Sequence, residues 1–203
     1  MTIDQIVKMF EKIPLPAQLV DIPERDFGLS PRDSQLLRNY GFNQDFMIQV
    51  TPPALDALYR AKETLDASEQ LHILSAYRPA ELLAILWHKR LQEVKNLYPT
   101  LDDRQIAQIA QSYTAAPDHP GFPPHSRGDA VDVGLVREGM AVPMFVPPQS
   151  FDQMHFGFHQ GTNESIHGNR AHLRTVMTRA GFIPYEKEYW HFGLTRVFPE
   201  VLR

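Results

Sequence analysis

The chain has 203 residues, of which 43% are hydrophobic and 22% are charged, and its formal net charge is −4. This length is sufficient for one domain with a substantial hydrophobic core, and the mild acidity argues against nucleic acid or an anionic membrane as the main partner. No apolar run in the sequence approaches the roughly 18 residues that a membrane span needs.

The absence of cysteine narrows the possible chemistry further. Disulfide bonds are excluded, and any metal site must use histidine and carboxylate ligands. Residues 1–8 lack the basic segment followed by an apolar one that marks a signal peptide. We therefore expect a cytoplasmic protein, or a periplasmic one if a leader precedes this sequence.

The first 50 residues are predicted to form a short helix followed by an irregular arm. Thr2 and Gln5 have the spacing of a capping box, and apolar residues from Ile3 to Phe10 then mark one helical face. Residues 15–50 carry turn signals and little periodicity, which favours at most one or two short strands. We expect a single domain over 1–203, with this arm at 1–50 and a catalytic core at 51–203.

The core is predicted to alternate helices and strands. We expect, in order, a helix from Pro53, a strand over 71–76, helices over 80–97 and 101–113, a hairpin near 137–144, a loop over 147–168, a helix from Asn169 to Gly181 and a strand over 182–194. Strands joined by a hairpin and by helices of mixed length are typical of an α+β fold, with a central antiparallel sheet flanked by helices.

One short segment combines a histidine, a glycine and a carboxylate. His125 and Asp132 are seven residues apart, and Gly128 between them allows a tight turn. Asp132 lies in an apolar run, where burial of a carboxylate is costly unless a cation pairs with it, and a divalent metal is one such cation. A surface pair of His and Asp is the alternative interpretation, and it is the commoner one for such spacing.

A second candidate segment lies near the C-terminus, where Glu188 and His191 flank Trp190. Residues three apart on an ideal strand point to opposite faces, so a bulge or strong twist would be needed for Glu188 and His191 to converge. The alternative is a terminal strand with an exposed Glu and a packed His. Two His and one Asp, with a free Glu beside them, would form an open hydrolytic zinc site.

His155 and His159 form a rival pair with the i, i+4 spacing of one helical face. Gly157 and Gly161 argue against a helix there, and no carboxylate is suitably spaced. We interpret these side chains as loop histidines that line the site entrance or are solvated. The role of the histidine-rich segment 155–172 stays open at this point.

Four motifs occur in order between about residues 50 and 194. They are Y-R-P at 77–79, H-x-x-G-x-A-x-D at 125–132, N-R-x-x-L-R-x-x-M-x-x-x-G-F-x-x-Y at 169–185 and E-x-W-H at 188–191. Together they resemble the zinc D-alanyl-D-alanine dipeptidases of the VanX type, a branch of the wider family of D-Ala-D-Ala metallopeptidases and hedgehog-like domains. Pro123 and Ser75 stand where this family often has a serine and an acidic residue, which leaves the substrate open.

The resemblance implies one zinc ion per chain and a role for each matched residue. The implied zinc ligands are His125, Asp132 and His191. Glu188 would be the general base, and Arg78 would stabilise the oxyanion of the tetrahedral intermediate. For Arg78 the alternative is a salt bridge that supports the turn at Pro79.

Substrate contacts are implied as well, from Tyr77, Trp190 and Asp152, whose carboxylate would receive the free amine of a dipeptide. An exposed loop carboxylate is the alternative interpretation of Asp152. The expected function is zinc-dependent hydrolysis of a small D-amino-acid peptide, above all D-alanyl-D-alanine. The alternatives are a D,D- or L,D-carboxypeptidase that acts on peptidoglycan stem peptides, and a zinc-bound, non-catalytic binding module.

Overall fold

The computed structural model describes residues 2–13, 15–16, 18–42, 48–117, 123–144, 164–186 and 188–195. In chain order, its elements are α1 (Ile3–Phe10), β1 (Val20–Asp21), β2 (Gly28–Leu29), α2 (Arg32–Asn39), β3 (Gln49–Val50), α3 (Pro52–Glu63), β4 (Glu69–Ser75), α4 (Ala80–Leu97), α5 (Asp103–Gln111), η1 (Pro124–Arg127), β5 (Ala130–Arg137), β6 (Met140–Ala141), α7 (Glu164–Arg179), β7 (Ile183–Tyr185) and β8 (Glu188–Gly193). This mixture of helices around a sheet confirms the predicted α+β class.

The central sheet has the strand order β2-β4-β5-β8-β7, and β6 pairs with β5 to complete the expected hairpin. Adjacent strands are antiparallel with one exception, because β2 runs parallel to β4. The predicted central antiparallel sheet is therefore confirmed, with a parallel strand added at this edge. Parallel neighbours need a long crossover connection, and here α2 and α3 lie in the chain between β2 and β4.

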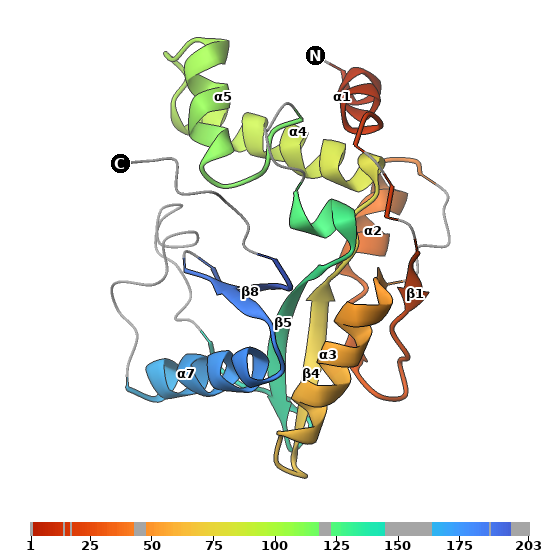
Figure 1. Ribbon diagram of the computed structural model, residues 1–203. Helices are drawn as coiled ribbons and strands as arrows, with labels where there is room; N and C mark the ends of the chain where they lie inside the picture. Colours follow the sequence, from red (N-terminus) through yellow and green to blue (C-terminus); the bar gives the residue numbers. More distant parts are fainter. Residues whose placement is uncertain are drawn as a thin grey trace.

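Helices cover one face of the sheet and one of its ends (Figure 1). Apolar residues of α3 and α7 pack with alternate residues of β4 and β5 into the main core. A second cluster joins α1, α4 and α5 beyond the end of the sheet where β4 finishes and β5 begins. The sheet end beside α4 is thus enclosed by helices, and it is there that the candidate residues gather.

The N-terminal arm is more regular than its sequence indicates. The capping box of Thr2 and Gln5 is present at α1, as predicted. The helix α2, however, was not predicted, because it has no side-chain cap and few apolar residues. Its Leu37 is fully buried against Leu82 and Ile85 of α4, so tertiary packing rather than local sequence stabilises this helix.

Two boundaries near the C-terminus also differ from the prediction. The helix α7 begins at Glu164 rather than Asn169, so the expected loop over 147–168 is wrong in its last five residues. The single strand expected over 182–194 is instead the hairpin of β7 and β8. Folding this segment back on itself places β8 between β5 and β7, in the interior of the sheet.

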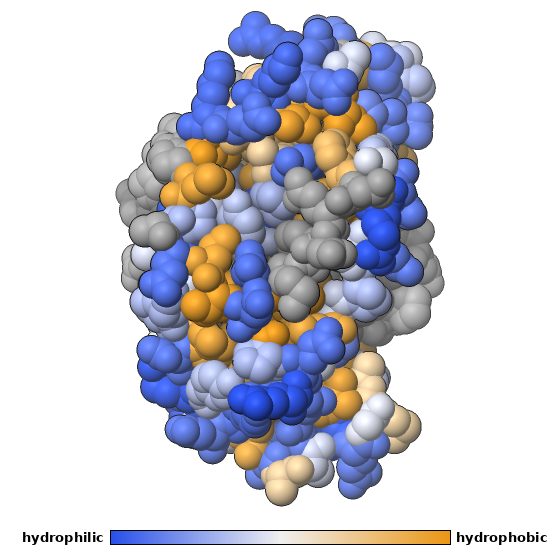
Figure 2. All heavy atoms as spheres, turned by 90° about the vertical axis from the view of Figure 1, so that its right-hand side faces the viewer, coloured by the Kyte–Doolittle hydropathy of each residue, from blue (hydrophilic) through white to orange (hydrophobic). Residues whose placement is uncertain are grey.

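On the face turned toward α3 and β1, hydrophilic residues surround several separate hydrophobic patches (Figure 2). Large apolar side chains with substantial exposure are few among the described residues, and they are spread over the chain: Leu15, Tyr40, Leu97, Tyr98 and Met140. In the part of the chain that the structure describes, no helix is both long enough and apolar enough to cross a membrane.

Candidate metal centre

Three neighbouring strands bring the candidate residues together. Asp132 on β5 lies opposite His191 on β8 and opposite Ser75 on β4. Directly opposed residues of adjacent strands point to the same face of a sheet. Because Val131 and Val133 point into the main core, Asp132 and His191 point to the other side. A register shift between Ile73 and Ser75 aligns the end of β4 with Asp132.

His125 reaches the same place from the short helix η1, which ends at Gly128. Gly128 has a φ of +71°, in the left-handed region that favours glycine. Its carbonyl oxygen accepts a hydrogen bond from the Thr51 amide at 2.8 Å, which fixes the turn against the start of α3. The tight turn predicted at Gly128 is therefore present, and it carries the chain from His125 into β5.

Replacement of Gly128 by alanine is expected to lower the free energy of unfolding by about 1–2 kcal/mol through backbone strain. A further loss is expected because the new Cβ would lie 2.6 Å from Cδ2 of Leu19. Gly139→Ala is the matched control, since Gly139 has a φ of +78° but its new Cβ would have no described heavy atom within 4 Å. Urea unfolding of both variants measures the difference, and equal losses would contradict the role assigned to Leu19.

Three donor atoms meet at the centre of the site. Nε2 of His125 lies 3.1 Å from Oδ1 of Asp132 and 3.1 Å from Nδ1 of His191, and that Nδ1 lies 3.0 Å from the same Oδ1. All three side chains are buried, with 4–6% of each residue exposed. Among the described residues, they form the one cluster of histidine and carboxylate groups that could hold a metal ion.

The protonation of His125 makes this arrangement unfavourable without a cation. Its Nδ1 lies 2.7 Å from the carbonyl oxygen of Ala76, which can only accept a hydrogen bond, so Nδ1 carries the proton. Burial and the nearby Arg78 lower the pKa of His125, which keeps the ring neutral and leaves a bare lone pair on Nε2. That lone pair faces the carboxylate oxygen of Asp132.

Asp132 is ionised in this setting. Burial alone would raise its pKa, but the positive charge of Arg78, which donates to Oδ2, outweighs burial and holds the pKa well below its usual range. Two acceptor atoms, Nε2 of His125 and Oδ1 of Asp132, thus lie in contact with no hydrogen between them. The Nε2 atom of His191 is buried without a hydrogen-bond partner among the described residues. A cation held among the three donor atoms would remove this repulsion.

The spacing of the donor atoms fits zinc. Zinc binds nitrogen and oxygen at about 2.0–2.2 Å in tetrahedral geometry, which separates its ligands by roughly 3.3 Å. The observed separations of 3.0–3.1 Å are close to this value. Three protein ligands leave one tetrahedral position open, as hydrolytic zinc sites require.

The cluster lines a cleft of about 430 Å³ that runs between α2, α4, the segment after α5 and the strands. This volume is in the range of small-molecule sites. Arg78, Glu188 and Trp190 line the same cleft. Glu188 and His191 therefore converge on one site, and the ladder of β7 and β8 has a register shift beside them, as the prediction of a bulge requires.

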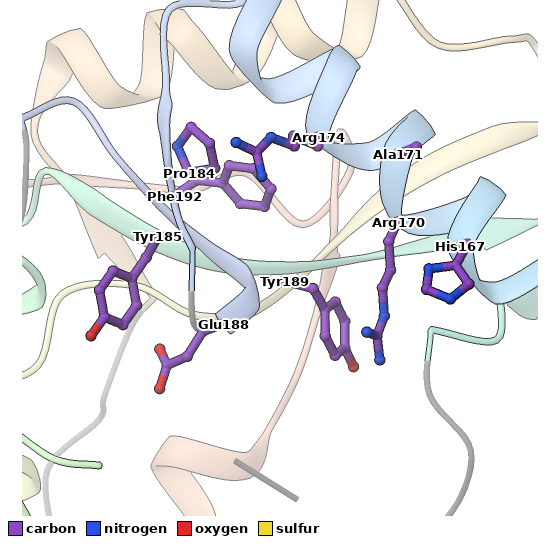
Figure 3. A pocket seen from close by; sticks show the side chains of 9 residues that line it. All are labelled: His167, Arg170, Ala171, Arg174, Pro184, Tyr185, Glu188, Tyr189 and Phe192. Carbon is purple, nitrogen blue, oxygen red and sulfur yellow. The ribbon is translucent and has the colours of Figure 1, made fainter. Parts of the chain in front are cut away.

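Glu188 also borders a second, smaller cavity of about 130 Å³ beneath α7. Figure 3 shows that the side chains of Tyr185 and Glu188 extend to the same side of the hairpin, whereas Arg170 lies against the ring of Tyr189, 4.5 Å from its centroid. Burial, followed by the charge of Asp132, raises the pKa of Glu188 to about 6. This carboxyl group can therefore take up and release a proton near neutral pH.

Arg78 contacts the cluster directly. Its guanidinium donates from one terminal nitrogen to Oδ2 of Asp132, the oxygen that does not face the histidines, and from Nε to Oγ of Ser75 at 2.9 Å. The sequence suggested two roles for Arg78, a contact with the oxyanion and a salt bridge that supports the turn at Pro79. Neither role included this contact with Asp132. Arg78 also lines the cleft, so the predicted contact with a substrate oxyanion stays a prediction.

The three predicted substrate contacts differ in what the structure says of them. Trp190 lines the cleft. Tyr77 is buried and is not among the residues that line the described cleft, so its predicted contact with substrate stays a prediction. Asp152, like His155 and His159, lies outside the described residues.

Sequence reasoning missed the contribution of α2 and α4 to the site. The cleft wall includes Arg32 and Asp33 from α2 and Lys89 and Arg90 from α4. Only α4 was expected as a helix, and the arm was interpreted as largely irregular. The Ser30-Pro31 turn before α2 was the one local signal of a helix start.

The fold and the site together define a metallohydrolase, with a buried His–Asp–His cluster in a cleft that also contains the carboxyl group of Glu188. Residues 43–197 match the family model Peptidase_M15, described as D-ala-D-ala dipeptidase. The chain therefore belongs to this peptidase family and is a metallopeptidase. The peptidases of this family are zinc enzymes, and zinc is the cofactor that the cluster fits.

Two curated relatives carry the name D-alanyl-D-alanine dipeptidase. The protein from Enterococcus faecium is 30% identical over 148 residues, which cover 68% of this chain and 69% of the relative. The protein from Escherichia coli (strain K12) is 30% identical over 129 residues, which cover 62% of this chain and 55% of the relative. A solved vancomycin resistance D,D-pentapeptidase in complex with Zn(II) is 19% identical, with a TM-score of 0.43 over 89% of this chain and 82% of that one.

Proposed function

We propose that this protein hydrolyses D-alanyl-D-alanine at a zinc ion held by His125, Asp132 and His191. The observation that carries the proposal is the meeting of three buried donor atoms at 3.0–3.1 Å in a cleft that also contains Glu188. The choice of substrate is supported by the family and by the names of the two curated relatives.

Zinc, when bound, supplies Lewis-acid chemistry that polarises a carbonyl group and makes water more acidic. The residues of the chain transfer the proton and bind and orient the substrate. The Glu188 carboxylate accepts a proton from the attacking water and later passes it to the departing amine. A pKa of about 6 suits both transfers, because a catalytic acid–base group works best when its pKa is near the working pH.

The other residues bind and orient. Arg78 fixes Asp132 through its Oδ2 atom, and in the proposed mechanism another edge of its guanidinium faces the developing oxyanion. Trp190 would pack against the substrate in the cleft, and Tyr77 is proposed as a further substrate contact. Asp152 would bind the free amine of the dipeptide. The cytoplasmic location expected from the sequence stays a prediction.

A carboxypeptidase that trims peptidoglycan stem peptides is the second candidate. The extent of the cleft favours it, because the lining continues away from the zinc cluster along α2 and α4, with Arg32 and Lys89 in its wall. A longer peptide would have room there. A non-catalytic binding module is less well supported, because binding zinc alone requires no additional carboxyl group such as that of Glu188 in the same cleft.

Acylation of the substrate amine separates the two enzymatic candidates. For a dipeptidase, kcat/KM for N-acetyl-D-Ala-D-Ala should be at least about 100-fold lower than for D-Ala-D-Ala, because a group that binds the ammonium is left unpaired. The release of D-alanine from both compounds measures this ratio. In Asp152→Asn the ratio should fall toward one. Faster cleavage of the acylated compound by the wild type would establish the carboxypeptidase.

A further inference from the structure

A chain of hydrogen bonds extends from the zinc cluster to the helix α2. Arg78 donates to Oδ2 of Asp132 and, from Nε, to Oγ of Ser75 at 2.9 Å. Oγ of Ser75 in turn lies 2.5 Å from Oδ2 of Asp33. Asp33 is thus linked to Asp132 of the cluster through two intermediate side chains, although Asp132 lies 99 positions further along the sequence.

The donors and acceptors fix the direction of this chain. An arginine side chain has only donors, so Oγ of Ser75 must accept from Nε of Arg78. The single hydroxyl hydrogen of Ser75 is then free to be donated to Asp33. The chain therefore needs an acceptor at its far end, and a carboxylate supplies one that also balances the charge of Arg78.

Asp33 is built into the structure as a buried group. Asp33 is 4% exposed and Ser75 is 3% exposed. Asp33 lies in the first turn of α2, where the helix dipole favours a negative charge. Burial of a carboxylate is costly unless the group is hydrogen-bonded and its charge is compensated. Asp33 is hydrogen-bonded to Ser75, and Ser75 in turn accepts from the cation Arg78. The same helix is held in place by Leu37 against α4.

We propose that Asp33 is a positioning residue for the metal centre. Through Ser75 it fixes the guanidinium of Arg78, and Arg78 holds Oδ2 of Asp132 so that Oδ1 faces the two histidines. This inference rests on the proposed zinc site. The N-terminal arm therefore contributes to the metal centre, because α2 carries Asp33, the outermost residue of the hydrogen-bond chain that ends at Asp132. Loss of a group that bonds a metal ligand directly lowers metal affinity or activity by about 10–100-fold, and Asp33, which acts through Ser75 and Arg78, should cost no more than the lower end of this range.

The test measures zinc affinity in the absence of substrate, by competition with a chromophoric chelator. Asp33→Ala should weaken zinc binding about 10-fold, the lower end of the range for groups that bond a ligand directly, and Asp33→Asn should weaken it less, because its amide oxygen still accepts from Ser75. The double variant Asp33→Ala/Ser75→Asp moves the carboxylate next to Arg78 and should restore affinity to within a few-fold of the wild type. Ser34→Ala is the matched control on α2, since the Ser34 hydroxyl donates to the Pro31 carbonyl of the same turn, and no contact with Ser75 or Arg78 is seen among the described residues.

Thermal unfolding of the zinc-free proteins identifies a merely structural role. If Asp33→Ala lowers the unfolding temperature and the double variant restores stability but not zinc affinity, the proposal is overturned. Wild-type zinc affinity in Asp33→Ala would also overturn it. A wild type that binds zinc but does not cleave D-Ala-D-Ala would refute the proposed function and leave this inference standing, whereas a wild type that binds no zinc would refute both.

Discussion

Glu188→Gln is expected to lower kcat for dipeptide cleavage by about 10²–10⁴-fold, the usual contribution of a general acid–base group. Glutamine has nearly the same shape as glutamate but cannot accept and pass on a proton. Zinc content should be unchanged, because Glu188 is not a member of the His125, Asp132 and His191 cluster. Steady-state kinetics together with metal analysis of the purified protein give both quantities.

The matched control is Glu186→Gln, two residues earlier in the same hairpin. Glu186 is exposed and pairs with Arg174 on α7, outside the cleft, so its replacement should leave kcat within about twofold, as for surface pairs that contribute little. Retention of wild-type kcat in Glu188→Gln with a full complement of zinc would exclude Glu188 as the general base. An equal loss in both variants would point to damage to the hairpin instead.

The pH profile tests the same assignment. A general base acts in its deprotonated form, so activity is present above its pKa and is lost as the pH falls through that value. Burial and the charge of Asp132 raise the pKa of Glu188 to about 6. A bound cation lowers the pKa of a neighbouring carboxyl group, so the acid limb of kcat/KM is expected at or below about pH 6. In Glu188→Gln this limb should disappear from the residual activity.

Asp132→Asn is expected to weaken zinc binding by more than about 100-fold, because changes outside the ligands already cost 10–100-fold. The substitution keeps the shape of the side chain but removes the negative charge that faces His125 and His191. It also takes the carboxylate partner from Arg78. Hydrolysis should be lost together with the metal, and chelator competition followed by an activity assay measures both.

A shift in melting temperature on addition of zinc gives an independent reading. A ligand that binds the folded state stabilises it more the further its concentration exceeds Kd, so zinc should raise the melting temperature of the wild type and, at the same concentration, not that of Asp132→Asn. Asp129→Asn is the control, because Asp129 lies three residues away and bonds to Arg127 and Thr195. One zinc ion per chain in Asp132→Asn would rule out the proposed ligand set.

Much of the site could be predicted from the sequence because its features are local. His125, Gly128 and Asp132 belong to one short segment, and the turn at Gly128 follows from the freedom of glycine to adopt a positive φ. The capping box of Thr2 and Gln5 is equally local, since two side chains within one turn satisfy free backbone amides. The need for a bulge beside Glu188 followed from the period of a strand.

The rest could not be predicted, because it depends on contacts between distant segments. The helix α2 is held by Leu37 against α4, and the parallel pairing of β2 brings Gly28 so close to His72 that a Cβ at Gly28 would lie 2.4 Å from the imidazole. No local pattern in the sequence predicts either contact. The division of the last strand into β7 and β8 likewise accompanies a long-range contact, the pairing of β8 with β5.

The sequence by itself determined which chemical groups this protein has for binding a metal and moving a proton, since these are properties of single side chains and short motifs. Only the tertiary structure decided which atoms meet. The pairing of β4, β5 and β8 places Ser75, Asp132 and His191 side by side, and packing of α2 brings Asp33 to Ser75. These contacts join residues 42 to 59 positions apart, and register and packing, rather than local preference, determine such separations.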